Sequence, residues 1–246
     1  MSKAPNHAAL YGLLAVLSAA ALAVAGCGST VQGDSELVVY ASLPTSGKDA
    51  DYGKAMAAGA KQALDDAGGE AAGAPVSLEV LDDADGATWT QSSVAANARN
   101  ATQDSTSIGY IGEFDSRATA ISAPITNEAG LLQLSPVGVP EDLLVAAGSD
   151  VPADIQTTGD RTLGALFPSN AHAAVIVPEG QAEDSDYFDY GYESMALVLD
   201  SIDRAEDPLS RADVVAAFLA TTDRTGKTGT YTIGTDGAAI YSSESG

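Results

Sequence analysis

Ser116 and Arg117 are the residues whose types and position could bind an anion. They follow an apolar run, Ile108–Gly112, that is typical of a buried strand, and they open a stretch with helical spacing, Arg117–Glu128. A serine at such a junction can cap the helix with its hydroxyl while free backbone N–H groups face a bound anion. We expect Ser116 either to contact a ligand or to be a plain helix cap. Arg117 would add positive charge there, or it is a solvated residue of the first turn.

Patterns for enzymatic chemistry are weak. Gly226-Lys227-Thr228 is similar to the end of a phosphate-binding loop, but Thr221 stands where that motif needs glycine. His172 is the only histidine beyond the N-terminal region, and a lone histidine is more often a surface residue than a general base. We therefore predict that the chain is not an enzyme and needs no cofactor.

Metal ligands are equally scarce. The chain has one cysteine and two histidines, which leaves little material for a thiolate or imidazole site. Asp82, Asp83 and Asp85 lack the spaced ligands and closing glutamate of a calcium loop, so we expect a solvated turn there. No metal site is predicted.

The charge balance restricts the partners. Eleven lysines and arginines stand against 34 aspartates and glutamates among 246 residues, for a net charge of −23. Such a surface repels polyphosphates, so nucleic acid is excluded as a partner, and a zwitterionic or neutral solute suits it better.

The N-terminus predicts export. Lys3 precedes the apolar run Leu10–Ala25, which at about 16 residues is short for a membrane span and typical of a signal peptide. The run ends in LAVAGC, which resembles the bacterial lipobox, with Cys27 as the lipid acceptor; the alternative is a buried structural cysteine in a helix. We expect residues 1–27 to be a lipoprotein signal and residues 28–35 a polar tether. The protein is then extracytoplasmic and held to the cell membrane by lipid on Cys27.

Strands and helices alternate in the remainder. Strands are expected over Glu36–Ala41, Val76–Leu81, Ile108–Gly112, Leu131–Leu134 and Ala173–Val177, helices over Ala50–Ala67, Thr88–Asp104, Arg117–Glu128, Tyr187–Ala205 and Arg211–Thr221, and a terminal hairpin over Gly229–Ile233 and Ala238–Tyr241. This order predicts an α/β fold, a three-layer αβα lobe with a mostly parallel sheet. Ligands of such sheets bind at the carboxyl ends of the strands.

Several runs resemble the type I periplasmic binding proteins of the branched-chain amino-acid branch. They are Leu43–Ala60 with its P-x-S-G-like loop and Tyr-Gly pair, Gly112–Ala120, Leu134-Ser135-Pro136, and Tyr190–Met195 with the sequence YGYESM. Their order over Glu36–Leu144 and Tyr187–Tyr241 carries the resemblance. It implies an ABC-transporter receptor that binds a solute without chemistry and hands it to a permease.

The resemblance also implies site residues. Ser116 matches the position that binds the ligand α-carboxylate, and Tyr52 matches an aromatic that lines the pocket, or else it packs against the first loop. Val137 could offer a backbone carbonyl. Val139 stands where the family often has a threonine whose hydroxyl contacts the ligand. The loss of this hydroxyl argues against specificity for amino acids.

The family has two lobes, and most of the second is missing here. We expect residues 36–144 and 187–246 to form the ligand-binding lobe, with 145–186 a loop-rich remnant where the second lobe would insert. Arg161–Asn170 resembles the segment that leads into that lobe, and the roughly 20 residues from there to Tyr187 are too few for a domain of about 50 or more. The predicted function is a tethered solute-binding lipoprotein for an amino acid or similar small polar solute. The alternative is a single-lobe variant that acts as a cell-surface interaction module.

Overall fold

The computed structural model describes residues 36–136, 173–175, 186–234, 237 and 239–242. The elements are β1 (Leu37–Leu43), α1 (Ala50–Asp66), β2 (Glu70–Ala71), β3 (Ala74–Asp82), α2 (Gln91–Gln103), β4 (Ser107–Ile111), α3 (Ser116–Glu128), β5 (Leu132–Ser135), β6 (Ala173–Val175), α6 (Asp186–Arg204), α7 (Arg211–Leu219), β7 (Arg224–Gly226), β8 (Gly229–Ile233) and β9 (Ala239–Tyr241).

The main sheet has the order β2-β3-β1-β4-β5-β6. All its pairs are parallel except β2 with β3. The first strand, β1, is central, and Val39 pairs with Leu78 of β3 on one side and Gly109 of β4 on the other. The direction in which the chain adds strands therefore reverses at β1. Open α/β sheets bind ligands at such a reversal, beyond the carboxyl ends of the strands, so the loops after β1 and β4 are the place to look.

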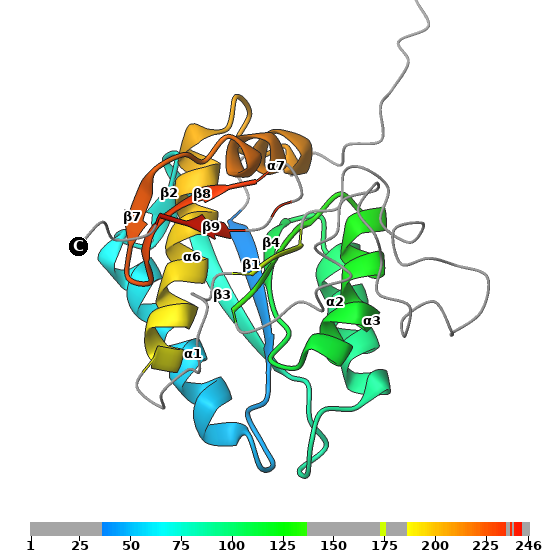
Figure 1. Cartoon of the computed structure of the whole chain (residues 1–246). Helices are drawn as coiled ribbons and strands as arrows, with labels where there is room; N and C mark the ends of the chain where they lie inside the picture. Colours follow the sequence, from blue (N-terminus) through cyan, green and yellow to red (C-terminus); the bar gives the residue numbers. More distant parts are fainter. Residues whose placement is uncertain (1–35, 137–172, 176–185, 235–236, 238, 243–246) are drawn as a thin grey trace, which may run out of the picture.

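Helices cover both faces of this sheet. One face carries α1 and α6, and the other carries α2 and α3 (Figure 1). The three-layer α/β lobe with a mostly parallel sheet, predicted from the alternation of strands and helices, is confirmed.

The contact between α1 and α6 depends on two glycines. A Cβ on Gly59 would lie 1.9 Å from the carbonyl oxygen of Phe188, and one on Gly191 would lie 2.0 Å from that of Met56. Only the absence of a side chain allows the two helix backbones to approach this closely. These helices are far apart in sequence, so residues on both sides of 137–185 build one layer.

The core lies between the sheet and the α1–α6 layer. An apolar stripe on α6, Met195, Val198, Leu199 and Ile202, is buried against the sheet, as are Met56, Ala60, Ala63 and Leu64 of α1. Ala67 is exposed, because α1 ends at Asp66.

A second, antiparallel sheet has the order β7-β8-β9. The predicted terminal hairpin is present in it, with Tyr231 paired with Tyr241. Two short strands, β2 and β7, were not predicted.

Several sequence predictions concern residues outside the described ones. These are the signal peptide and Cys27, the tether 28–35, Val137, Val139, and the segment 145–186 apart from Ala173–Val175 and Asp186. Within the described ranges no helix combines the length and apolar character needed to cross a bilayer.

Candidate functional site

Three aromatic rings meet at the carboxyl edge of the sheet. Tyr52 in the first turn of α1 stacks on Phe114 of the β4–α3 loop, with ring centroids 5.9 Å apart, and lies 4.5 Å from Tyr187 in the first turn of α6. Phe114 and Tyr187 are 5.8 Å apart. Tyr52, a predicted site residue, thus contacts the loop that leads to Ser116. Its two aromatic neighbours, Phe114 and Tyr187, were not predicted as site residues from the sequence.

Ser116 is the first residue of α3, but the residue that caps the helix is Asp115. The Asp115 carboxylate accepts a hydrogen bond from the backbone N–H of Arg117 at 2.9 Å. A cap by the Ser116 hydroxyl was one sequence expectation, and it is wrong by one position. Hydrogen bonds from Arg117, above all, lower the pKa of Asp115 to about 2, so this end of α3 already carries a negative charge.

The Arg117 side chain contacts Asp115 and Trp89. Its guanidinium forms an ion pair with Asp115 at 2.7 Å and lies 5.5 Å from the centre of the Trp89 ring, a cation–π contact. The Trp89 side chain also donates a hydrogen bond to Asp115. The Arg117 side chain is 76% exposed, which fits the solvated first-turn alternative.

Beneath these loops lies a fully buried glutamate, Glu113. Its carboxyl accepts hydrogen bonds from the hydroxyls of Ser42 at 2.8 Å and Tyr110 at 2.6 Å. Its backbone carbonyl accepts from Ser135 Oγ at 3.0 Å, and its backbone N–H donates to Thr119 Oγ1 at 3.4 Å. Glu113 therefore ties β1, β4, β5 and α3 together at the edge where their loops begin.

Asp83 is buried beside Glu113. The prediction of a solvated turn is wrong for this residue: its side chain hydrogen-bonds to Glu113, and its Oδ1 has no hydrogen-bond partner. The turn after β3 folds back through a bridge between Ala84 and Trp89; within this turn Asp83 is buried and Asp85 is exposed. Asp82, half-buried, accepts from the backbone N–H of Thr45 at 2.9 Å.

Burial raises the pKa of both carboxyls of the pair. The pKa of Asp83 rises to about 7, mainly through burial and then through the nearby Asp82 charge, and that of Glu113 rises to about 8 through burial. The hydroxyl donors around Glu113 oppose the rise without cancelling it. Two carboxyls that titrate near neutral pH thus lie under the candidate ligand loops.

One signal in the sequence points to Glu113. It lies two residues beyond β4, whose five residues are all buried, so the backbone continues inward before it reaches the surface. Among the described residues no group of three or more histidine, cysteine, aspartate or glutamate side chains is arranged to hold a metal ion.

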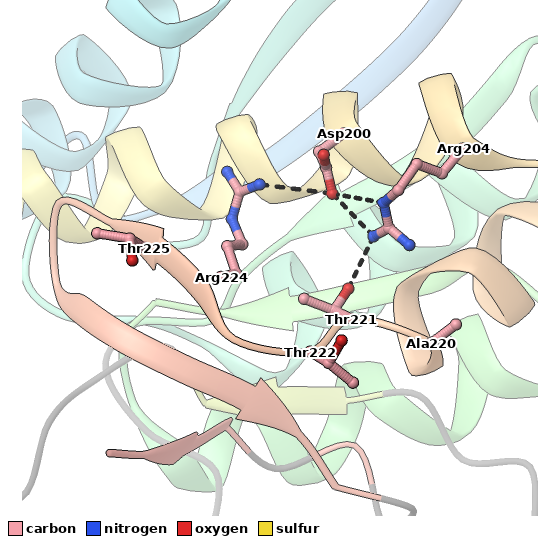
Figure 2. Close-up of a pocket in the computed structure, with 7 residues that line it drawn as sticks. All are labelled: Asp200, Arg204, Ala220, Thr221, Thr222, Arg224 and Thr225. Atoms are coloured by element: carbon pink, nitrogen blue, oxygen red, sulfur yellow. Dashed lines mark hydrogen bonds and ion pairs between the residues drawn. The ribbon is translucent and has the colours of Figure 1, made fainter. Parts of the chain in front are cut away.

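A hollow lies at the other end of α6. We call it the arginine pocket; its volume is about 370 Å³, and it is lined by Asp200, Arg204, Ala220, Thr221, Thr222, Arg224 and Thr225 (Figure 2). Asp200 lies about 20 Å along the helix axis from Tyr187, since each residue advances about 1.5 Å.

Both arginines of this pocket are paired. Arg204 donates to Asp200 at 2.8 Å, to the Ala217 carbonyl at 2.6 Å and to Thr221 Oγ1 at 2.7 Å. Arg224 donates to the buried Glu193 at 2.8 Å and lies 3.4 Å from Asp200 (Figure 2). Each positive charge meets a carboxylate, so the pocket links α6 to the β7–β8 hairpin and holds no net charge for an anion.

Comparison with solved structures identifies the architecture. A leucine-binding protein from Thermotoga maritima superposes with a TM-score of 0.63 and 14% identity, over 83% of this chain and 93% of that one. The chain has the type I periplasmic-binding fold. No protein-family model matches it, and neither does any curated protein.

Other structures with the type I periplasmic-binding fold broaden the range of ligands. A branched-chain amino-acid transporter protein from Streptococcus pneumoniae, in complex with isoleucine, gives a TM-score of 0.61 at 14% identity over 84% of this chain and 94% of that one. A solute-binding protein of an ABC transporter from R. palustris, in complex with benzoate, gives 0.61 at 12% identity over 84% and 91%. These neighbours are transporter solute-binding proteins for amino acids and aromatic acids, not enzymes.

Proposed function

We propose that the chain is an extracytoplasmic solute-binding lipoprotein of an ABC transporter, which binds an amino acid or a similar small polar solute. The observation that supports this most is the meeting of Tyr52, Phe114 and Tyr187 beside Ser116 at the reversal point of the sheet. Stacked rings supply an apolar wall, and the Ser116 hydroxyl and first-turn N–H groups supply polar contacts next to it.

The ligand carboxylate would approach the start of α3 between Ser116 and Arg117. Asp115 already occupies part of this helix terminus, so Arg117 must supply the compensating charge, either in place or by leaving Asp115. Val137 and Val139 would complete the proposed site as backbone or apolar contacts.

The tether and permease belong to the same proposal. Lipid on Cys27 and the polar segment 28–35 would hold the lobe, residues 36–144 with 187–246, close to the membrane where a permease receives the solute. The segment 145–186 would be the loop-rich remnant at the place where the family inserts its second lobe. Incorporation of radiolabelled palmitate, lost in Cys27→Ser, tests the anchor; an unlabelled wild-type protein contradicts it.

A thermal-shift screen of residues 28–246 against L-leucine, L-isoleucine, other amino acids and benzoate tests solute binding. A dose-dependent rise in melting temperature for one chemical class supports the proposal, because a ligand stabilises only the fold that binds it. Ser116→Ala should weaken binding by about 1–3 kcal/mol if Ser116 contacts the carboxylate. Ser105→Ala, exposed before β4 at the opposite edge, is the control.

A second candidate is a single-lobe interaction module at the cell surface. Val139 favours it, because valine cannot donate the hydroxyl contact of the family, and so does the pairing of Arg117 with Asp115. A cooperative melt that none of these solutes moves would support this candidate over the first.

A further inference from the structure

The buried pair Asp83–Glu113 lies at the root of the loop that carries Phe114, Asp115 and Ser116. We propose that the two carboxyls share protons as one unit and act as positioning residues for this loop, so that ligand binding at the carboxyl edge is linked to proton uptake. The ligand half of this inference rests on the proposed function; the proton-controlled loop geometry does not.

No cation compensates the pair within the described part of the chain. Neither carboxyl forms an ion pair with a lysine or arginine there. The charged groups that act on Asp83 are acids from three places: Asp82 at the end of β3, Asp115 before α3 and Asp49 before α1. Around Glu113 the polar neighbours are the neutral groups of Ser42, Tyr110 and Ser122. Asn97 of α2 donates to Ser42 Oγ at 3.0 Å. A second negative charge would therefore stand in a buried region with only hydroxyl donors.

The described geometry fits a protonated pair. Only 1% of Asp83 and none of Glu113 is exposed, so water cannot solvate a doubly ionised pair without movement of the chain. The pKa values raised by burial place the loss of the protons in the neutral to mildly alkaline range. Above that range the carboxyls must separate or admit water.

Such a movement would reach the ligand loops directly. The backbone of Glu113 is fixed to Ser135 and Thr119, and the next residue, Phe114, stacks on Tyr52. Asp115 follows as the α3 cap and accepts hydrogen bonds from Trp89 and Arg117. A shift of the Glu113 side chain therefore changes the place of Phe114 and the start of α3 together.

Trp89 reports this movement, because it is the only tryptophan of the chain and it contacts both Asp115 and Arg117. We expect the emission of the purified wild-type protein to change in a transition between about pH 6 and about pH 9. Asp115 and Arg117 do not titrate there, since their pKa values are shifted away from neutrality in opposite directions.

Glu113→Gln keeps the shape of the side chain and removes its titration, so it should abolish or displace the Trp89 transition. Asp85→Asn, an exposed acid of the same turn as Asp83, should leave it unchanged. A transition with the same midpoint in Glu113→Gln, or none in the wild type, overturns the proposal. If Glu113→Gln does not fold, infrared absorption of protonated carboxyls in the wild type decides: a band present near pH 6 and absent near pH 9 supports the pair, and its absence at both overturns it.

The ligand half is tested with L-leucine, and with benzoate if leucine gives no heat. Calorimetric titration in two buffers of different ionisation enthalpy counts the protons exchanged on binding. We expect proton uptake near pH 8 and an affinity that falls by up to about tenfold per pH unit above it. Binding without proton exchange overturns the link between ligand binding and proton uptake, but not the effect of the carboxyl pair on the loop. No binding of any probe contradicts the proposed function, while the Trp89 transition still tests the loop.

Discussion

Glu113 and Glu193 are both buried glutamates, but the side chains around them differ in charge. Glu193 on α6 is 1% exposed and meets the Arg224 guanidinium at 2.8 Å, the Tyr231 hydroxyl at 2.6 Å and the Lys227 backbone N–H at 2.9 Å. Glu113 has an equally close tyrosine, Tyr110 at 2.6 Å, but its other polar side-chain neighbours include two serines, Ser42 and Ser122, and another acid, Asp83. Burial is the same; the compensating charge is not.

The difference assigns different tasks to the two ends of the lobe. The Glu193–Arg224 pair fastens the β7–β8 hairpin to α6, and the pKa of Arg224 is raised by its hydrogen bond to Glu193 despite burial. The ion pair at this end of the lobe holds the hairpin in one position on α6. The Asp83–Glu113 end retains protons that ordinary changes of pH can remove, under the loops proposed to bind a solute.

The largest effect should come from Glu193→Ala. The substitution leaves Arg224 half-buried with only Asp200, 3.4 Å away, as a carboxylate partner, and removes the acceptor of the Tyr231 hydroxyl and the Lys227 backbone N–H. Breaking a buried ion pair typically destabilises by about 3–5 kcal/mol. Urea denaturation measures the loss, with Glu206→Ala, an exposed acid just beyond α6, as the control. An equal decrease in the free energy of unfolding in the two variants would show that the Glu193–Arg224 pair does not stabilise the fold.

The pH dependence of stability should separate the two glutamates next. The folded-state pKa values of Asp83 and Glu113 are raised, so their stabilising contribution is fully present below the unfolded values near 4 and is lost as pH rises through about 7 and about 8. As pH rises above about 4, the free energy of unfolding should fall by about 1.4 kcal/mol for each proton and pH unit, and the curve should level off once pH passes about 7 for Asp83 and about 8 for Glu113. Glu113→Gln should flatten this curve. A wild-type curve that is already flat over this range contradicts the assignment.

Two tyrosine variants compare the sites with the same chemical change. Tyr231→Phe removes a donor from a glutamate paired with arginine and should cost about 1.5–3 kcal/mol, the range for hydrogen bonds to charged groups. Tyr110→Phe at about pH 6 removes a donor from a protonated pair and should cost about 0.5–1.5 kcal/mol. Denaturation at that pH distinguishes them, and a larger cost for Tyr110→Phe would reverse the comparison.

The smallest effects are expected from the helix caps at the two ends. Asp115→Ala removes the cap of α3, and Ser210→Ala removes the cap of α7, whose hydroxyl accepts from the Asp213 N–H at 3.3 Å. Each should cost about 1 kcal/mol. Only the Asp115 effect should shrink with added salt, because its carboxylate also interacts with the helix dipole and Arg117.

The sequence predicts the elements better than the site. Period and strand–helix alternation place β8 with its exact bounds and α1 within a residue, because each of these signals is local. Ser116 and Asp115 are both good helix caps, so residue type alone cannot choose between them.

Which acid of Asp82, Asp83 and Asp85 is buried depends on contacts made by other strands and loops. Asp83 lies in the turn closed by the bridge between Ala84 and Trp89, and it contacts Glu113, which follows β4. Neither contact can be predicted from the residues near Asp83 in the sequence. The same holds for Tyr187, which reaches Tyr52 only because α6 packs on α1.

The glycine contact between α1 and α6 sets an order for assembly during synthesis. The groove-forming face of α1 at Gly59 is made well before its partner segment around Phe188 and Gly191 leaves the ribosome. Until then one face of the growing sheet lacks half of its cover, and contacts so distant in sequence form slowly. The layer of α1 and α6 can therefore be completed only late in synthesis, after the segment around Gly191 has been made.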